Sequence, residues 1–152
     1  RRDEVHVLTY LAQTLEKAGD LDGAQATHQL ALSHRHELGQ HAASIENVAG
    51  LARIALEQDD LATARDYVDQ ALDHLQEYGL IHIEAPSLLH LSVIRVLQAG
   101  GEQERAAQVL DKAYEQLMER AGKIVDPTLL RSFLERVVEN QALIALWQEK
   151  ES

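Results

Sequence analysis

The apolar residues of this chain return at steps of three and four residues, which is the period of an amphipathic helix. The alternation typical of strands is nearly absent. Residues 80–83 are the only short strand candidate, and because they lead to Pro86 we interpret them as a linker before a helix with Pro86 in its first turn. Three apolar stripes stand out: Val5, Leu8, Leu11, Ala12 and Leu15; Val48, Leu51, Ala52 and Ala55; Leu89, Val93, Ile94 and Leu97.

Helix-breaking residues recur about every twenty residues, at Gly19, Gly39, Asp59, Gly79, Gly100-Gly101 and Gly122. Each is a candidate helix stop, because glycine accepts the left-handed conformation that often ends a helix. The connections are so short that neighbouring helices must be antiparallel. We predict eight helices, at about 3–18, 21–38, 41–58, 61–78, 85–99, 102–121, 127–137 and 141–149.

Pairs of alanines recur along the chain with a spacing of seven residues, which places both members of a pair on one helix face. The first alanines of successive pairs are 40 and then 42 residues apart. A period near 40 with two helices in each unit is typical of a stacked solenoid. Small side chains let the two helices of a hairpin approach closely. The pairs are Ala24 and Ala31, Ala64 and Ala71, and Ala106 and Ala113.

The order of helix, Gly-Asp-Leu, alanine and Ala-Leu resembles the tetratricopeptide repeat. Residues 8–32 carry it most fully, residues 48–72 repeat it around Asp59-Asp60-Leu61, and the third unit keeps its two alanines. The units exceed the usual 34 residues and resemble the long repeats of kinesin light chains and of the sensor regions of bacterial signal-transduction ATPases and maltose-regulator-like activators. Residues 126–149 resemble the closing segment of bacterial ATPase or cyclase proteins that end in such repeats.

The resemblance implies an all-α fold, a right-handed α-α superhelix of about three antiparallel helix pairs with a C-terminal capping pair. We expect a single domain over residues 1–152, with units at about 3–38, 41–78 and 85–121 and the cap at 127–149. The sequence does not open with Met, so we expect a fragment of a larger protein.

Composition narrows the functions that this fold can serve. The chain of 152 residues has a formal net charge of −11, which disfavours direct binding of nucleic acid. No apolar run has the length of a membrane span, and no signal peptide opens the chain. The absence of Cys excludes disulfides and thiolate chemistry, and it fits a cytoplasmic location.

The sequence offers only weak candidates for chemistry, so we expect no enzyme, no cofactor and no metal. The segment HELGQH places His36 and His41 five residues apart across Gly39, whereas a zinc-protease helix needs histidines four apart. His34 joins these two in a cluster that could bind a metal adventitiously. The acidic run around Glu57 could suggest paired carboxylates, but end caps and solvated charge explain it more simply.

Three large side chains at apolar positions of the pattern are expected to be packed, and two of them have an alternative interpretation. We interpret His28 as a packed, hydrogen-bonded residue and His90 as a packed one, with metal ligation of His28 as the alternative. Trp147 lies on the apolar stripe of the last predicted helix, with Leu143, Ile144 and Leu146, where it would shield the final repeat from water or, alternatively, anchor a partner.

In this class of repeat, the first helices of successive units line the concave face, and the resemblance implies which residues would face a partner there. We call these nine the predicted groove residues. Arg53 and Arg95 lie one unit apart and would each bind a carboxylate, unless they pair internally with Glu46 or Glu57. The nine are Thr9, Gln13, Lys17, Glu46, Arg53, Glu57, Leu91, Arg95 and Gln98.

We therefore predict a protein-protein interaction module that binds a partner peptide or helix in this groove, within a larger bacterial signalling ATPase or regulator. The alternative is a structural module that self-assembles, for example into a homodimer.

Overall fold

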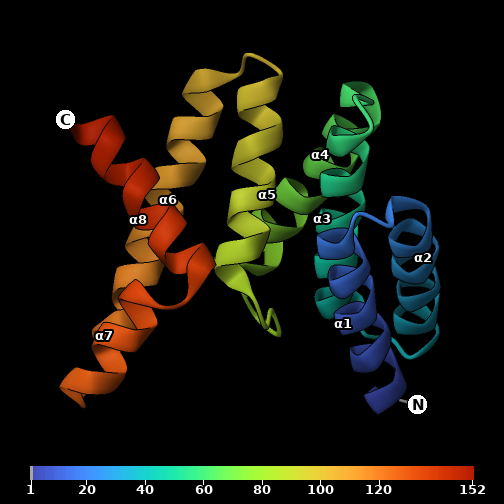
Figure 1. Ribbon diagram of the computed structural model, residues 1–152, viewed down its shortest axis with the longest axis horizontal. Coiled ribbons are helices and arrows are strands. Elements are labelled where there is room, and N and C mark those ends of the chain that lie inside the picture. The colour runs from blue at the N-terminus through green and yellow to red at the C-terminus, as the bar shows by residue number, and fades with distance from the viewer. Residues whose placement is uncertain (1) are drawn as a thin grey trace. The chain divides into compact units, whose positions relative to one another are not determined.

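The computed structural model describes the backbone of residues 2–152 and the side chains from Glu4 onward, and over this range it consists of helices and short connections without strands. Figure 1 shows the two helices of each hairpin running antiparallel, α1 with α2, α3 with α4 and α5 with α6. The first six agree with the predicted ranges to within one residue. The eight helices are α1 (Arg2–Ala18), α2 (Leu21–Glu37), α3 (His41–Glu57), α4 (Leu61–Tyr78), α5 (Pro86–Ala99), α6 (Gln103–Ala121), α7 (Pro127–Glu135) and α8 (Val138–Glu151).

The break between the last two helices lies earlier than predicted. Helix α7 ends at Glu135, and Val137 is the extended N-cap of α8, which begins at Val138, three residues before the expected start. The start of α7 is well marked, since the Asp126 carboxylate accepts hydrogen bonds from the N–H groups of Thr128 and Leu129. No glycine or proline marks the next break, so the periodicity alone could not locate it.

The turn within each hairpin has the same geometry three times. Its left-handed residue is Gly19 in the first hairpin (φ 85°), Asp59 in the second (φ 58°) and Gly101 in the third (φ 76°). The residue after it donates its N–H to the carbonyl five positions earlier, at 2.9 Å in all three hairpins. This hydrogen bond is the one that closes a helix at a left-handed residue. The same turn closes α2, where Gly39 is left-handed and Gln40 donates its N–H to the Arg35 carbonyl at 2.7 Å, so the turn marks helix ends both within and between the repeats.

One of the predicted helix stops has a different backbone conformation from the others. Gly39 and Gly79 are left-handed as expected, with φ of 71° and 65°. Gly122 ends α6 as predicted, but in a right-handed conformation with φ of −63°. His82 takes a left-handed conformation instead, with φ of 62°, within the connection that the sequence pattern assigned as a linker.

The chain divides into two compact units, Arg1–Ala85 and Pro86–Ser152. In the first unit, α2 packs against both α1 and α3, and α4 packs against α3. In the second unit, α5 pairs with α6, and α8 packs against both of them, while the short α7 contacts α6 and α8. The division into one domain of four parts stays a prediction.

The paired alanines lie in the core, as expected of spacers between helices. All six are at most 2% exposed.

Trp147 on α8 stacks against Tyr114 on α6, with ring centroids 3.9 Å apart and nearly parallel planes. This contact supports the shielding interpretation of Trp147. None of the helices in the described range has the length and apolar character needed to cross a membrane.

Candidate functional site

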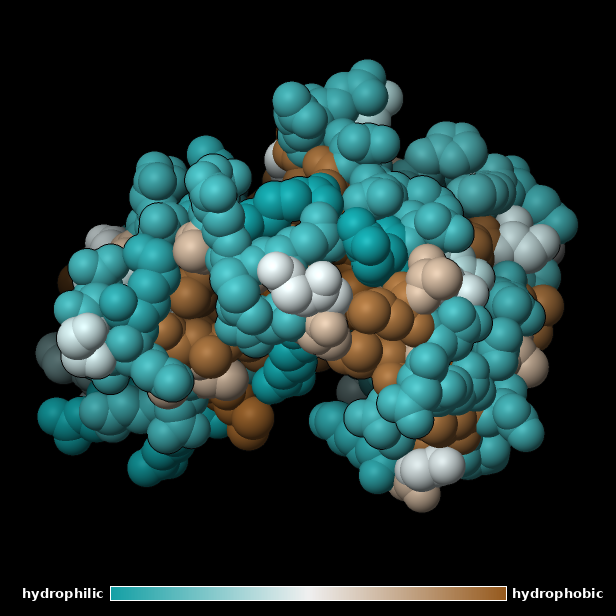
Figure 2. All heavy atoms as spheres, turned by 90° about the horizontal axis from the view of Figure 1, so that it is seen from above, coloured by the Kyte–Doolittle hydropathy of each residue, from teal (hydrophilic) through white to brown (hydrophobic). Residues whose placement is uncertain are grey.

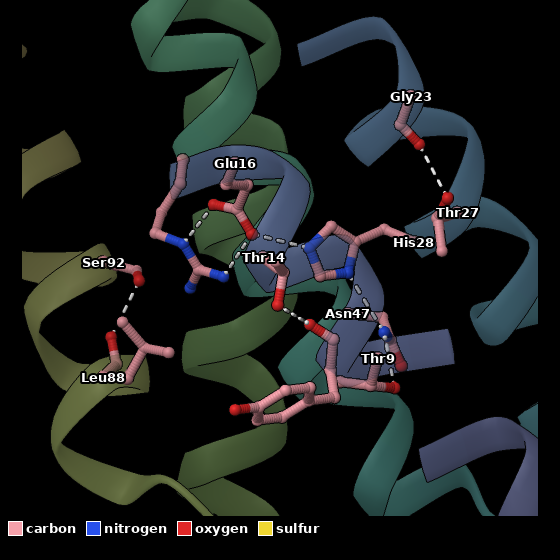
Figure 3. A network of polar contacts seen from close by, with 11 residues as sticks. Thr9, Thr14, Glu16, Gly23, Thr27, His28, Asn47, Leu88 and Ser92 are labelled. Atoms are coloured by element: carbon pink, nitrogen blue, oxygen red, sulfur yellow. Dashed lines mark hydrogen bonds and ion pairs between the residues drawn. The ribbon is translucent and has the colours of Figure 1, made fainter. Parts of the chain in front are cut away.

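A buried polar network joins the first three helices. Each helix contributes two of its members, and the two on α1 and the two on α2 are seven residues apart, so each of these pairs shares one helix face. Figure 3 shows Glu16, His28, Asn47 and Thr9 lying in a row between the helices. The network consists of Thr9 and Glu16 on α1, His28 and Arg35 on α2, and Asn47 and Arg53 on α3.

Glu16 is the centre of the charged end of this network. Arg53 donates to both of its carboxylate oxygens, from Nε at 2.7 Å and from Nη2 at 2.9 Å. His28 donates from Nε2 to the same carboxylate at 2.8 Å. Burial alone would raise the pKa of Glu16, but the hydrogen bonds from His28 and Arg53 outweigh it, and the net pKa lies below the ordinary value. Glu16 is therefore a carboxylate held in its charged form.

His28 is fully buried and hydrogen-bonded through both ring nitrogens, which confirms the packed interpretation. The Asn47 amide donates from Nδ2 to Nδ1 of His28 at 3.1 Å. Nδ1 is then an acceptor, so the proton of a neutral ring resides on Nε2, where it faces Glu16.

Gly50 on α3 provides the space that the ring of His28 occupies. A Cβ added at Gly50 would lie 2.3 Å from Nε2 and 2.4 Å from Cε1 of His28. Glycine in a helix interior costs about 1 kcal/mol relative to alanine. The glycine at position 50 lets α2 and α3 approach closely, and any side chain at this position would prevent that approach.

Thr9 connects the neutral end of the network to Arg35. Its hydroxyl donates to the Val5 carbonyl at 3.1 Å, and it accepts from Arg35 Nη2 and from Asn47 Nδ2, each at 3.2 Å. Because the hydroxyl proton is already directed to the backbone, Thr9 is not arranged as a nucleophile. The network fixes three helices relative to one another and provides a rigid base for the surface above it.

The network answers the question that the sequence left open for Arg53. Arg53 pairs with Glu16, which the sequence analysis did not consider, and the pair has the bidentate geometry of a strong ion pair. The Glu46 carboxylate is used elsewhere, since it accepts the N–H groups of Glu84 and Ala85 at 3.2 and 2.8 Å. Burial raises the pKa of Glu46 even though these hydrogen bonds lower it.

Above the network lies a hollow of about 530 Å³ beside α1, which we call the α1 hollow. Apolar side chains also reach the solvent in patches on the face shown in Figure 2. Tyr10 and Val7 are 74% and 65% exposed. The lining includes the predicted groove residues Thr9, Gln13 and Glu46, and the apolar residues Val7, Tyr10 and Leu11.

The rim of the α1 hollow carries charge from two sides. Glu84, from the connection before α5, lines it together with Glu46. His6 on α1 contacts Glu84, with Nδ1 and Oε1 3.2 Å apart. The hollow thus combines apolar side chains with two carboxylates and one histidine.

The other six predicted groove residues do not line the α1 hollow. Lys17 is exposed on α1, and Glu57 is exposed on α3. Of the three on α5, Leu91 is buried, Arg95 is exposed and Gln98 is half-buried. Because α5 belongs to the second unit, these three are not assigned to the same surface as the first six.

The remaining histidines form no metal centre within the part of the chain that the structure describes, where no group of three or more histidines or carboxylates could hold an ion. The rings of His36 and His41 do lie side by side, with centroids 5.2 Å apart and planes tilted by 48°. Gly39 breaks the helix between them, as the sequence analysis predicted.

No model of a known protein family, no curated protein and no solved structure gives a significant match to this chain. The resemblance to tetratricopeptide repeats therefore stays a prediction, which rests on the residues of the repeat pattern and on the repeated turn.

Sequence reasoning missed the partners that complete the site. Glu16, Arg35 and Tyr10 were not singled out, although the spacing of seven residues from Thr9 to Glu16 and from His28 to Arg35 was visible. Gly50 in the middle of a predicted helix was a further signal, because a glycine there costs stability unless another side chain needs the space.

Proposed function

We propose that this chain is a helical-repeat protein-interaction module, of the long tetratricopeptide type, and that it binds a segment of a partner protein in the α1 hollow. Two observations support the repeat. The hairpin turn recurs with one backbone geometry at Gly19, Asp59 and Gly101. The paired alanines are buried in every unit. A right-handed superhelix of these hairpins is part of the proposal.

The observation that carries the binding function is the exposure of Val7, Tyr10 and Leu11 around the α1 hollow, at 65, 74 and 44%. Tyr10 and Leu11 lie three and four residues after Val7, so one face of α1 presents all of them. The network beneath holds Thr9 between α2 and α3, which keeps that face in a fixed position. A preformed apolar surface loses little entropy when a partner binds to it.

The charges of the α1 hollow favour a partner segment with an apolar side chain next to a basic one. Glu46 and Glu84 line the hollow, and the chain as a whole carries a net charge of −11. A lysine or arginine of the partner would meet complementary charge there. The sequence analysis expected Arg53 and Arg95 each to bind a carboxylate of the partner. Arg53 instead binds the carboxylate of Glu16, so it does not support an acidic partner.

The wider role that we propose is that of a sensor or scaffold part of a larger bacterial signalling ATPase or regulator, and it rests on the family resemblance. Self-assembly is the second candidate. Large apolar side chains around α7 favour it, since Val125, Leu129 and Val138 are 94, 63 and 72% exposed.

A selection from a random peptide library tests the binding function. The Tyr10→Asp variant removes the central apolar side chain of the hollow and puts a charged carboxylate where the apolar side chain of the partner would pack. Tyr78→Asp is the matched control, because Tyr78 is also exposed, at 53%, but lies at the end of α4, away from the α1 hollow.

We expect the selected peptides to share an apolar residue beside a lysine or arginine, and to bind Tyr10→Asp at least about tenfold more weakly than the wild type while binding Tyr78→Asp equally well. Equal binding to both variants would refute the α1 hollow as the site. Light scattering at several protein concentrations tests self-assembly, the second candidate. The apparent mass of a self-assembling chain rises with concentration, and it falls in a variant that disrupts the contact.

A further inference from the structure

A second hollow, of about 510 Å³, lies at the start of α3, and we call it the α3 hollow. It shares His6 and Glu84 with the α1 hollow but is otherwise built from different residues. The turn between α2 and α3 provides Gly39 and Gln40, the first turn of α3 provides Ala42 and Ala43, and the connection before α5 provides His82.

The N-terminus of α3 lies at this hollow, which is lined by its N-cap residue Gln40 and by Ala42 and Ala43 of its first turn. Its N-cap residue, Gln40, makes no side-chain hydrogen bond to the turn, and no acidic residue lies in the turn. Helices α2 and α4 differ, because the carboxylates of Asp20 and Asp60 cap them. An uncapped helix N-terminus carries a partial positive charge and donors that suit an anion.

A buried arginine lines the same hollow with most of its donors unused. Arg35 is 2% exposed, and among the residues that the structure describes it makes one hydrogen bond, from Nη2 to Thr9. Its Nε is buried without a partner. A guanidinium offers five N–H donors, and leaving them unpaired in the interior is costly.

The charges that face Arg35 favour a ligand with a single negative charge. Burial lowers the pKa of Arg35, and the charges of Glu46 and Glu84 partly offset this effect. Both carboxylates would repel an incoming anion, and a doubly charged phosphate would be repelled more strongly than a carboxylate. His6 and His82 also line the hollow and provide further nitrogen donors.

From the uncapped α3 terminus and the unused donors of Arg35, we infer that the α3 hollow binds a small carboxylic acid. The carboxylate accepts hydrogen bonds from the Arg35 guanidinium and from the N–H groups at the start of α3. The volume leaves room for a larger organic acid than acetate. This site is separate from the peptide site proposed for the α1 hollow.

The test is an NMR titration of the chain with sodium acetate and sodium butyrate, two singly charged carboxylates, at fixed ionic strength, in which the backbone amide signals of Ala42 and Ala43 are followed. Ala42→Asp places a carboxylate in the first turn of α3. This carboxylate stabilises the helix, but it fills part of the α3 hollow and repels an incoming carboxylic acid. Ala62→Asp is the matched control, because Ala62 is the second residue of α4, as Ala42 is of α3. Arg35→Met removes the guanidinium.

We expect saturable shifts in the wild type and in Ala62→Asp, and at least about tenfold weaker binding in Ala42→Asp and Arg35→Met. If Arg35→Met fails to fold, the comparison of the two Asp variants still decides the question. Shifts that do not saturate, or that persist in Ala42→Asp, would overturn the inference. Inorganic phosphate that binds as tightly as butyrate would overturn the assignment to carboxylic acids. Tyr10→Asp leaves this titration unchanged, so the two sites are tested independently.

Discussion

The Glu16 carboxylate and the Arg53 guanidinium form a two-pronged ion pair between α1 and α3, with distances of 2.7 and 2.9 Å. Both side chains are about 15% exposed, so the pair is largely removed from water. His28 of α2 donates to the same carboxylate at 2.8 Å. One acidic residue therefore joins three helices.

Glu16→Gln should lower the free energy of unfolding by about 3 kcal/mol, because it leaves the Arg53 charge and His28 without an anionic partner. Urea denaturation at pH 7 measures this loss. Glu57→Gln, an exposed position on α3, should change stability by less than about 0.5 kcal/mol. The double variant Glu16→Gln/Arg53→Met should lose less than the sum of the two single changes. Strict additivity would show that the pair is not coupled.

The same pair predicts a dependence on pH. The pKa of Glu16 lies below its ordinary value of 4.5 in the folded state, so its stabilisation is fully present above pH 4.5 and is lost as the pH falls below that value. The stability difference between the wild type and Glu16→Gln should therefore shrink below pH 4.5. A difference that stays constant down to pH 3 would contradict the assignment.

His90 on α5 should make the protein less stable in weak acid. Burial, with a smaller effect of the Arg120 charge, lowers the pKa of His90 from 6.5 to about 4. The unfolded chain thus binds the proton more readily, and stability should fall by about 3 kcal/mol as the pH drops from 6.5 to 4. His90→Leu should flatten this part of the profile, measured by urea denaturation, while His41→Gln, an exposed histidine, should not. An unchanged slope in His90→Leu would refute the assignment to His90.

Gly50→Ala should destabilise the chain even though alanine favours a helix. The new Cβ would lie 2.3 Å from the His28 ring, so the ring must move and its bonds to Glu16 and Asn47 weaken. We expect a loss of about 1–3 kcal/mol, typical of overpacking. Gly122→Ala is the control, because Gly122 is right-handed and a Cβ there meets only atoms at 3.5 Å. In a His28→Ala background the loss caused by Gly50→Ala should largely disappear.

Ala64→Leu tests the alanines as spacers between the helices of a hairpin. Ala64 is 0% exposed, so a larger side chain must push α4 away from the helix it packs on. Thermal denaturation should show that the free energy of unfolding falls by about 1–3 kcal/mol. Ala62→Leu, two residues earlier on the exposed face of α4, should be nearly neutral. Tolerance of leucine at Ala64 would mean that the repeated alanines have no spacing role.

The sequence predicted most of the helices because their ends are marked by residues with special backbone properties. Gly19, Asp59 and Gly101 end their helices where the pattern indicated. The break before Val138 was misplaced because α8 begins at a valine after an extended residue, without glycine or proline. The periodicity of apolar residues indicates which face of a helix is buried, but it does not indicate at which residue the helix ends.

The site was less predictable because it depends on which polar side chains meet across helices. Thr9, Gln13 and Glu46 were predicted to face a partner, and they line the α1 hollow. Arg53 was placed on the same surface, but its charge is directed to Glu16, which lies 37 residues away in sequence. Such pairings are set by the packing of α1, α2 and α3, which the spacing of residues within one helix cannot give.

The most direct test of the proposed function is a methyl NMR titration of the chain with a peptide from the library selection. We predict that the methyl signals of Val7 and Leu11 shift saturably, and that signals of Leu129 on α7, which is 63% exposed, do not. The shifts should disappear in Tyr10→Asp. Saturable shifts confined to α7, or shifts of Val7 and Leu11 that survive in Tyr10→Asp, would contradict the α1 hollow as the binding site.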